Sequence, residues 1–262
     1  MRQAFKIGLS GAAVFALGLL VGTRLHWPQD RLAFVHTDTT GHVPQPCPKD
    51  AFVMVVFGQS NSANFVGTRH DPPPDVLSHY DGKCWRADDP LLGAEGDQGN
   101  IAVPLAARLR AGKPVVVEAL GIGSSTVDEW LRGALRPFYD RRAANLKATY
   151  PKVDLIVWIQ GEKDQGTDPA ELRADLESWL RQVRSDFPGA RIGITGTSFC
   201  LGEFGPSVVA AQRDTANKLG LLYLGETDAF HAREDRRDGC HWSALGAERV
   251  ADMMAKAIRP AL

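Results

Sequence analysis

Five short apolar runs, each continuous and rich in β-branched residues, constrain the fold of this chain most strongly. Continuous runs of this length are typical of strands that are buried on both faces of a parallel sheet. Segments with a helical pattern lie between and after them, and strands alternating with helices predict a three-layer α/β/α sandwich around a central, mostly parallel, five-stranded sheet. The runs are Ala51–Phe57, Pro114–Leu120, Val153–Ile159, Arg191–Thr195 and Leu221–Leu224.

The clearest helical segment has Asp168 as its expected N-cap and continues from Pro169 to Phe187, where Pro188 and Gly189 end it. Further helices are expected at Ile101–Ala111, Arg136–Tyr150, Ser207–Leu219 and Ser243–Ile258. In open α/β sheets, active groups gather in the loops at the carboxyl ends of the strands. We therefore look for functional residues directly after each predicted strand.

The N-terminus differs from the rest of the chain. Arg2 and Lys6 precede a stretch without charge that extends from Ile7 to Gly22. This pattern is typical of a signal anchor or a signal peptide, and the absence of a clear small-x-small cleavage site favours the anchor. Either segment would export the remainder, leaving it on the periplasmic or extracellular side, anchored to the membrane if uncleaved. We expect residues 1–25 to form this segment, 26–49 a linker and lead-in loop, and 50–262 one folded domain.

The charge balance argues against a nucleic-acid partner. The chain has 30 basic and 31 acidic residues, so no basic excess is available to neutralise phosphates.

Four cysteines suit an exported chain. No CxxC pair occurs, which makes a zinc site a poor fit. An oxidising compartment permits two disulfides with three possible connectivities, and four free thiols are the alternative. We favour Cys47–Cys84 and Cys200–Cys240, because each pair would join neighbouring loop segments.

The first predicted strand leads directly into a small polar cluster, within the sequence VVFGQSNSAN. If Ser60 opens a helix, its hydroxyl lies near the positive end of the helix dipole, where free backbone N–H groups could bind an oxyanion. Taken alone, the pattern favours a serine that only caps a helix, which is a common role for serine.

The next two strand ends are also polar. The second ends in ALGIGSSTVDEW, where Gly121 and Gly123 permit a tight loop with exposed N–H groups. The third ends in WIQGEKDQG, where the Gln160 amide can donate a hydrogen bond and Glu162 and Asp164 can orient neighbouring groups. An ordinary turn and solvated acids are the alternative interpretations.

The segment DGCHW, just before the last predicted helix, places Asp238 and His241 three residues apart. A carboxylate at that spacing can accept from one imidazole nitrogen and leave the other free as a base. His231 follows Asp228 at the same spacing and is the rival pair. A metal site built from His231, Asp228 and Asp238 is weaker, because no fourth ligand is evident.

Together, the four segments resemble the SGNH hydrolase superfamily, and more narrowly its carbohydrate-esterase branch of sialate O-acetylesterase-like and acetyl xylan esterase-like proteins. FGQSN is similar to the nucleophile block, GIGSSTVDEW to the glycine block, WIQGEKD to the QGE-x-D block and DGCHW to the D-x-x-H block. The resemblance extends from Phe52 to Ala257 and implies a flavodoxin-like sheet.

The resemblance also implies residue roles. Ser60 matches the nucleophile, His241 the general base and Asp238 its orienting acid. The oxyanion donors would be the backbone N–H groups of Ser60 and Gly123 and the side-chain amide of Gln160, with Gly121 as the alternative glycine. Glu162 would be a second, supporting acid, and Asn61 would shape the nucleophile's loop. No metal or organic cofactor is required.

The implied function is an exported serine esterase that removes O-acetyl groups from a carbohydrate through an acyl-enzyme. An O-acetyltransferase or a general carboxylester hydrolase with the same triad is the alternative. A catalytically inactive glycan-binding module is disfavoured, because Ser60, His241 and Asp238 are all present. The polar, proline-rich stretch from Asn61 to Asn100 predicts a long loop near the site rather than an apolar lid.

Overall fold

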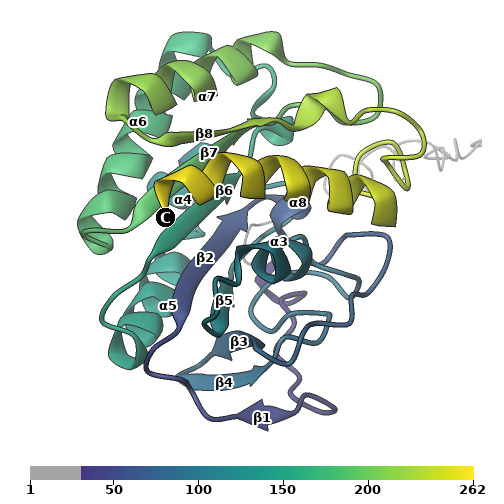
Figure 1. Ribbon diagram of the computed structural model, residues 1–262. Helices are drawn as coiled ribbons and strands as arrows, with labels where there is room; N and C mark the ends of the chain where they lie inside the picture. The colour runs from purple at the N-terminus through teal and green to yellow at the C-terminus, as the bar shows by residue number, and fades with distance from the viewer. Residues whose placement is uncertain (1–30) are drawn as a thin grey trace, which may run out of the picture.

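The computed structural model describes residues 31–262, and one sheet forms the centre of this part (Figure 1). Its strand order is β1-β4-β3-β5-β2-β6-β7-β8. All five predicted runs form strands, which are β2 (Phe52–Gly58), β5 (Val115–Ala119), β6 (Leu155–Ile159), β7 (Arg191–Gly196) and β8 (Leu222–Glu226). The predicted α/β sandwich with a mostly parallel sheet is confirmed.

The sheet has eight strands, so the predicted number of five is wrong. The additional strands are β1 (Pro44–Gln45), β3 (Val76–Tyr80) and β4 (Lys83–Arg86). β3 pairs parallel to β5, whereas β4 and β1 extend that edge in antiparallel pairing. The stretch between Asn61 and Asn100 is therefore not one long loop, and the segment expected to be a lead-in contributes an edge strand.

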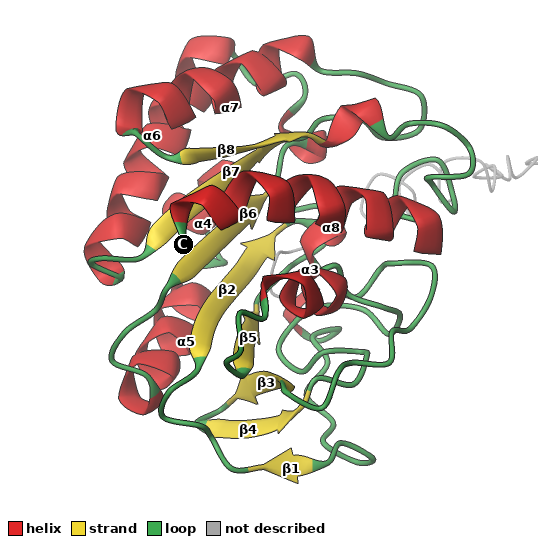
Figure 2. Ribbon diagram, viewed as in Figure 1, coloured by secondary structure: helices red, strands yellow, loops and turns green. Residues whose placement is uncertain are grey.

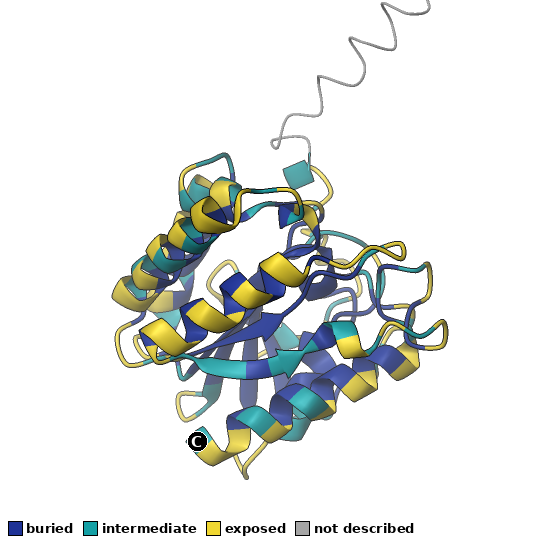
Figure 3. Cartoon of the chain, turned by 90° about the horizontal axis from the view of Figure 1, so that it is seen from above, coloured by how far each residue is buried: buried dark blue, intermediate teal, exposed yellow. Residues whose placement is uncertain are grey.

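Helices cover both faces of the sheet. Alternate residues of β2 point to opposite faces, and both sets are buried. Val55 and Phe57 pack with the helices of one face, and Met54 and Val56 pack with those of the other. On the first face lie α4 (Val127–Leu131), α5 (Arg136–Thr149), α6 (Pro169–Asp186) and α7 (Pro206–Leu219), and on the second lie α3 (Ala102–Leu109) and α8 (Ala244–Ile258). Figure 3 shows the strands buried between helices whose outer sides are exposed.

The first face carries an aromatic cluster around Phe57. Its ring makes edge-to-face contacts with Trp130 and Trp158, with centroids 5.6 and 4.8 Å away, and with Trp179 at 6.0 Å. Such pairs contribute about 0.5–1.5 kcal/mol each beyond the burial of their area. The cluster lies directly beneath the end of β2 and gives that strand end a rigid base.

Side-chain caps fix where several helices begin. Asp168 accepts from the backbone N–H of Ala170 and Glu171 at the start of α6, as predicted, and Ser243 caps α8. Thr126 and Glu129 form a reciprocal capping box at α4, a short helix that the sequence pattern did not predict. α4 begins within the glycine block, directly after its GIGSST loop (Figure 2).

The predicted N-terminal anchor, with its apolar stretch from Ile7 to Gly22, lies outside the described residues. Within residues 31–262, the structure contains no helix of the length and apolar character that spanning a bilayer requires.

Candidate active site

The strands β5, β2 and β6 are neighbours in the sheet, so their carboxyl ends and the loops that follow them lie together. β2 ends at Gly58, whose φ of +133° is a conformation that favours glycine. A Cβ there would lie 2.0 Å from the carbonyl oxygen of Ile159. Glycine thus lets the chain turn tightly against β6 just before Ser60.

Ser60 begins a 3₁₀ turn, η1 (Ser60–Ser62), rather than an α-helix. Three residues are too few for the aligned peptide dipoles that the sequence argument invoked. The Ser60 side chain makes no capping bond, and the residue is 6% exposed. The simple interpretation of Ser60 as a helix cap therefore does not apply here.

Ser60 lines a cleft of about 360 Å³ at this edge of the sheet. Loops from five separate parts of the chain meet there, including the end of β6 and the DGCHW segment. Of the predicted site residues, Ser60, Glu162, Asp238 and His241 line the cleft, as do Cys200 and Cys240. The lining is completed by Gln59, Ser124, Lys163 and Leu201. The four sequence blocks thus meet in one place.

Asp238 and His241 form the predicted local pair. Nδ1 of His241 lies 2.7 Å from Oδ2 of Asp238, while Oδ1 accepts the backbone N–H groups of Cys240 and His241 at 3.0 and 2.8 Å. Burial alone would raise the pKa of Asp238, but these hydrogen bonds outweigh it and hold the pKa well below its usual range. An ionised carboxylate only accepts, so Nδ1 carries the proton and Nε2 is left as the basic nitrogen.

Phe65 also contacts His241: its ring stacks on the imidazole, with the ring centroids 5.0 Å apart. The sequence pattern did not single out Phe65. Stacking and the Asp238 bond together restrict the imidazole to one plane.

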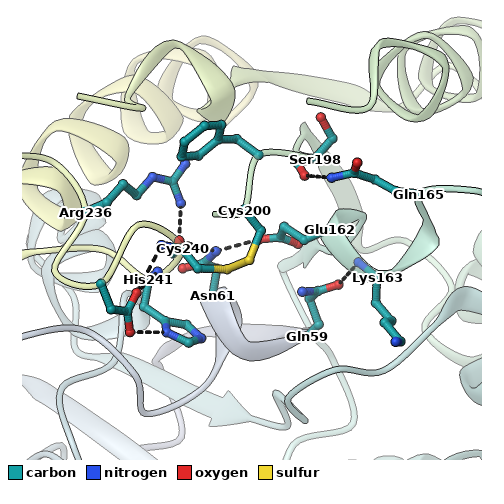
Figure 4. The surroundings of a disulfide bond; sticks show 12 residues. Gln59, Asn61, Glu162, Lys163, Gln165, Ser198, Cys200, Arg236, Cys240 and His241 are labelled. Carbon is teal, nitrogen blue, oxygen red and sulfur yellow. Dashed lines mark hydrogen bonds and ion pairs between the residues drawn. A yellow bond between two sulfur atoms is a disulfide. The ribbon is translucent and has the colours of Figure 1, made fainter. Parts of the chain in front are cut away.

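Asn61 links the loop of Ser60 to two other loops of the site (Figure 4). Its Nδ2 donates to Oε1 of Glu162 at 2.5 Å and to the carbonyl oxygen of Cys240 at 3.3 Å. The backbone carbonyl oxygen of Asn61 accepts from Nε1 of Trp242 at 3.3 Å. Burial raises the pKa of Glu162 to about 7, although the hydrogen bond from Asn61 opposes this.

Cys200 and Cys240 form a disulfide in the wall of the cleft, and Cys47 and Cys84 form the second one near β1, so the favoured pairing is confirmed. Arg236 supports the same wall from behind. Its buried guanidinium lies 3.6 Å above the Trp242 ring and donates to the carbonyl oxygens of Cys240 and Phe230 at 2.6 and 2.7 Å. Burial lowers the pKa of Arg236 to about 10, so it remains charged at neutral pH.

Two of the expected oxyanion donors have other partners. The N–H of Gly123 donates to Oε2 of Glu95 at 2.6 Å. The buried amide of Gln160 donates to the carbonyl oxygen of Ser125 at 2.6 Å and to Oδ2 of Asp164 at 2.7 Å. Neither group is free to bind a substrate in this arrangement, and neither residue lines the cleft.

The alternative glycine, Gly121, is not better placed. A Cβ there would lie 2.6 Å from the backbone of Ser62 and Ala63, so Gly121 packs against the loop of Ser60. Ser124 follows the glycines with a φ of +53° and does line the cleft.

The rival pair of His231 and Asp228 does not form. Nδ1 of His231 bonds to the backbone oxygen of Asp228 at 2.9 Å. The Asp228 carboxylate accepts instead from the hydroxyl and N–H of Ser198 and from the N–H of Phe199. His231 lines a separate hollow beside Phe204 and Arg213. Among residues 31–262, no group of three or more His, Cys, Asp or Glu side chains is arranged to hold a metal ion.

Comparison with known proteins supports the interpretation of the four blocks. The model of one family, "Carbohydrate esterase, sialic acid-specific acetylesterase", matches residues 49–259. A search of curated proteins gave no significant match.

Solved structures share the fold at low sequence identity. A protein from Arabidopsis thaliana superposes with a TM-score of 0.61 at 16% identity, covering 81% of this chain and 98% of that one. NanS has a TM-score of 0.59 at 14% identity, with 82% and 98% covered. Est24, a carbohydrate acetylesterase from Sinorhizobium meliloti, has a TM-score of 0.55 at 14% identity, with 80% and 100% covered.

Proposed function

Because the chain belongs to the carbohydrate esterase family of sialic acid-specific acetylesterases and is a carboxylic ester hydrolase of the SGNH superfamily, we propose that it removes O-acetyl groups from a carbohydrate with Ser60 as its nucleophile. One observation carries this proposal. Ser60 and the hydrogen-bonded pair of Asp238 and His241 come from opposite ends of the domain sequence, yet they line the same cleft.

In the acylation step, Nε2 of His241 takes the proton of the Ser60 hydroxyl as Oγ attacks the acetyl carbonyl carbon. The tetrahedral intermediate collapses, the bond to the sugar oxygen breaks, and His241 returns the proton to that oxygen. Water then attacks the acetyl-Ser60 ester in the same way, and acetate leaves. The ionised Asp238 stabilises the imidazolium that forms twice in this cycle.

The developing oxyanion requires donors beside Ser60. We assign the backbone N–H of Ser60 to this role, and the N–H of Ser124 in place of that of Gly123. Neither the Ser60 nor the Ser124 N–H has a hydrogen-bond acceptor within residues 31–262. A donor of this kind contributes about 2.7–4 kcal/mol to lowering the barrier in comparable hydrolases.

Asn61 and Glu162 act in this proposal by positioning. They connect the loop of Ser60 to the carbonyl of Cys240, the residue next to His241. The nucleophile and its base are thereby fixed relative to each other, although they lie on different loops.

The proposal includes export of the domain. Two disulfides are typical of proteins from oxidising compartments, and they agree with the N-terminal segment read from the sequence. An acetylated carbohydrate outside the cytoplasm is therefore the expected substrate.

The full-length protein tests the proposal through hydrolysis of p-nitrophenyl acetate and release of acetate from acetylated sialic acid, xylan and peptidoglycan fragments. Ser60→Ala and His241→Ala are expected to lose most of the activity. Ser207→Ala, on the exposed start of α7, and His231→Ala, from the rival pair, are the matched controls and should retain it. Undiminished turnover in Ser60→Ala would refute the mechanism, and acetyl transfer to an added sugar would identify a transferase instead.

A further inference from the structure

Gln59 and Gln160 lie side by side, because the strands that precede them are in register. Gly58 pairs with Ile159 across β2 and β6, and each glutamine follows directly. Their amides are 3.2 Å apart, between Nε2 of Gln160 and Oε1 of Gln59. Only one of the two residues, Gln59, lines the cleft.

The orientation of the Gln59 amide is determined by its partners. Its Oε1 also accepts the backbone N–H of Lys163 at 3.0 Å. A backbone N–H can only donate, so the oxygen end of the amide must face Lys163. The Gln160 amide is fixed in the same manner, because its Nε2 faces the carboxylate of Asp164 and the carbonyl oxygen of Ser125.

The nitrogen end of Gln59 is consequently the free end. Figure 4 shows the oxygen turned toward Lys163 and the nitrogen turned away from it. Nε2 has no acceptor among residues 31–262, although the residue is only 3% exposed. A nearly buried donor of this kind gains most from a ligand that supplies an acceptor oxygen.

From this geometry, we propose that Nε2 of Gln59 donates a hydrogen bond to the acetyl carbonyl oxygen of the substrate and strengthens that bond as the oxygen becomes negatively charged. This inference rests on the proposed role of the adjacent Ser60. An amide nitrogen only donates, and the substrate acceptor that becomes negatively charged when Ser60 attacks is the carbonyl oxygen. Gln160 then acts one layer below, as the residue that positions Gln59.

Preorganisation supports this role for Gln59. The N–H of Lys163 holds its Oε1, with Nε2 of Gln160 as a longer contact at 3.2 Å, so the amide does not have to rotate or give up a partner when the substrate binds. Fixed donors aimed at developing charge are more effective than mobile ones, since no reorganisation accompanies the reaction.

Two substitutions separate donation from simple support. Gln59→Glu retains an oxygen for Lys163 and Gln160 but removes the donor, whereas Gln59→Met removes both functions at similar size. If Gln59 donates to the oxyanion, both variants should lose about 10²–10³-fold in kcat while KM changes little. Gln59→Glu should recover part of its kcat, relative to wild type, at low pH, where a protonated carboxyl group can donate.

Gln45→Glu, the same change on the exposed edge strand β1, is the matched control and should behave as wild type. If Gln59→Glu keeps wild-type kcat while Gln59→Met loses it, Gln59 only supports its neighbours and the inference is overturned. Full activity in both variants overturns it as well. Ser60→Ala, assayed in parallel, separates the two proposals: its activity, and not that of the Gln59 variants, decides whether Ser60 is the nucleophile.

Discussion

The two disulfides offer a matched pair of perturbations, because they close loops of almost equal length. Cys47 and Cys84 are 37 residues apart, and Cys200 and Cys240 are 40 apart. The chain-entropy relation for closing a loop of this size gives about 4 kcal/mol of stabilisation for each. Replacing either pair with alanine should therefore lower the free energy of unfolding by a similar amount.

Their effects on catalysis should differ. The Cys200–Cys240 bond joins the cleft wall to the turn that carries His241, and the N–H of Leu201 donates to the carbonyl oxygen of Gly239 on the same turn. Without the bond, the turn gains freedom to move relative to Ser60. Misplacement of catalytic groups by about 1 Å costs on the order of 10²-fold in rate. Cys47–Cys84 ties β4 to the segment after β1, away from the cleft.

The assay combines urea unfolding with kcat for p-nitrophenyl acetate, measured well below the unfolding transition. Cys200→Ala/Cys240→Ala is expected to lose at least about tenfold in kcat, and Cys47→Ala/Cys84→Ala is expected to keep nearly all of it. Equal losses of kcat in the two double variants, or none in the first, would refute the reasoning that the disulfide positions the His241 turn.

Two further predictions concern the residues behind the cleft. Burial raises the pKa of Glu162 from its ordinary 4.5 to about 7, so the folded protein keeps a proton that the unfolded chain loses between those values, and stability falls as pH rises through this window. The difference in pKa corresponds to about 3 kcal/mol of stability. Glu162→Gln should therefore be more stable than wild type in urea unfolding at pH 8, but not at pH 4.5. Glu203→Gln, at an exposed position, is the control and should show no such change. Arg236→Lys retains the charge but loses most of the guanidinium hydrogen bonds to the carbonyl oxygens of Cys240 and Phe230. We expect it to lower the free energy of unfolding in urea by about 1–3 kcal/mol. An unchanged urea midpoint would mean that those bonds contribute little.

The sequence predicts the fold correctly where a strand is a continuous apolar run. The five continuous apolar runs are buried on both faces, so burial and β-propensity point the same way. β3 and β4 were missed because they contain polar residues whose partners lie far along the chain. His79 of β3 is fully buried, with its Nδ1 2.6 Å from Oε2 of Glu118. This pair cannot be recognised in the sequence, because it forms only when β5 lies beside β3. A strand that depends on such a partner reads as a loop in the sequence.

The candidate site likewise contains a part that local sequence predicts and a part that depends on distant residues. Asp238 and His241 could be paired from the sequence because three residues of chain already bring them together. The expected roles of Gly123 and Gln160 depended on which groups were left free, and that is decided at a distance. Glu95 binds the N–H of Gly123 from 28 residues away, and Ser125 binds Gln160 from 35 residues away. A motif identifies the residue, but it does not identify the acceptor that its donor already has.

The two glutamines illustrate why parallel strand ends are suited to building such sites. Gln59 and Gln160 directly follow a paired position of β2 and β6, yet of the two only Gln59 lines the cleft. The deeper residue is surrounded by protein acceptors and therefore becomes fully bonded, as Gln160 is. The oxygen of its neighbour Gln59 accepts hydrogen bonds from Gln160 and Lys163, and its nitrogen is left for the cleft. The free donor at the cleft thus follows from the bonds that Lys163 and Gln160 make to the Gln59 oxygen. Replacing Gln160 should disturb catalysis through the orientation of Gln59 and through the lost bonds to Ser125 and Asp164.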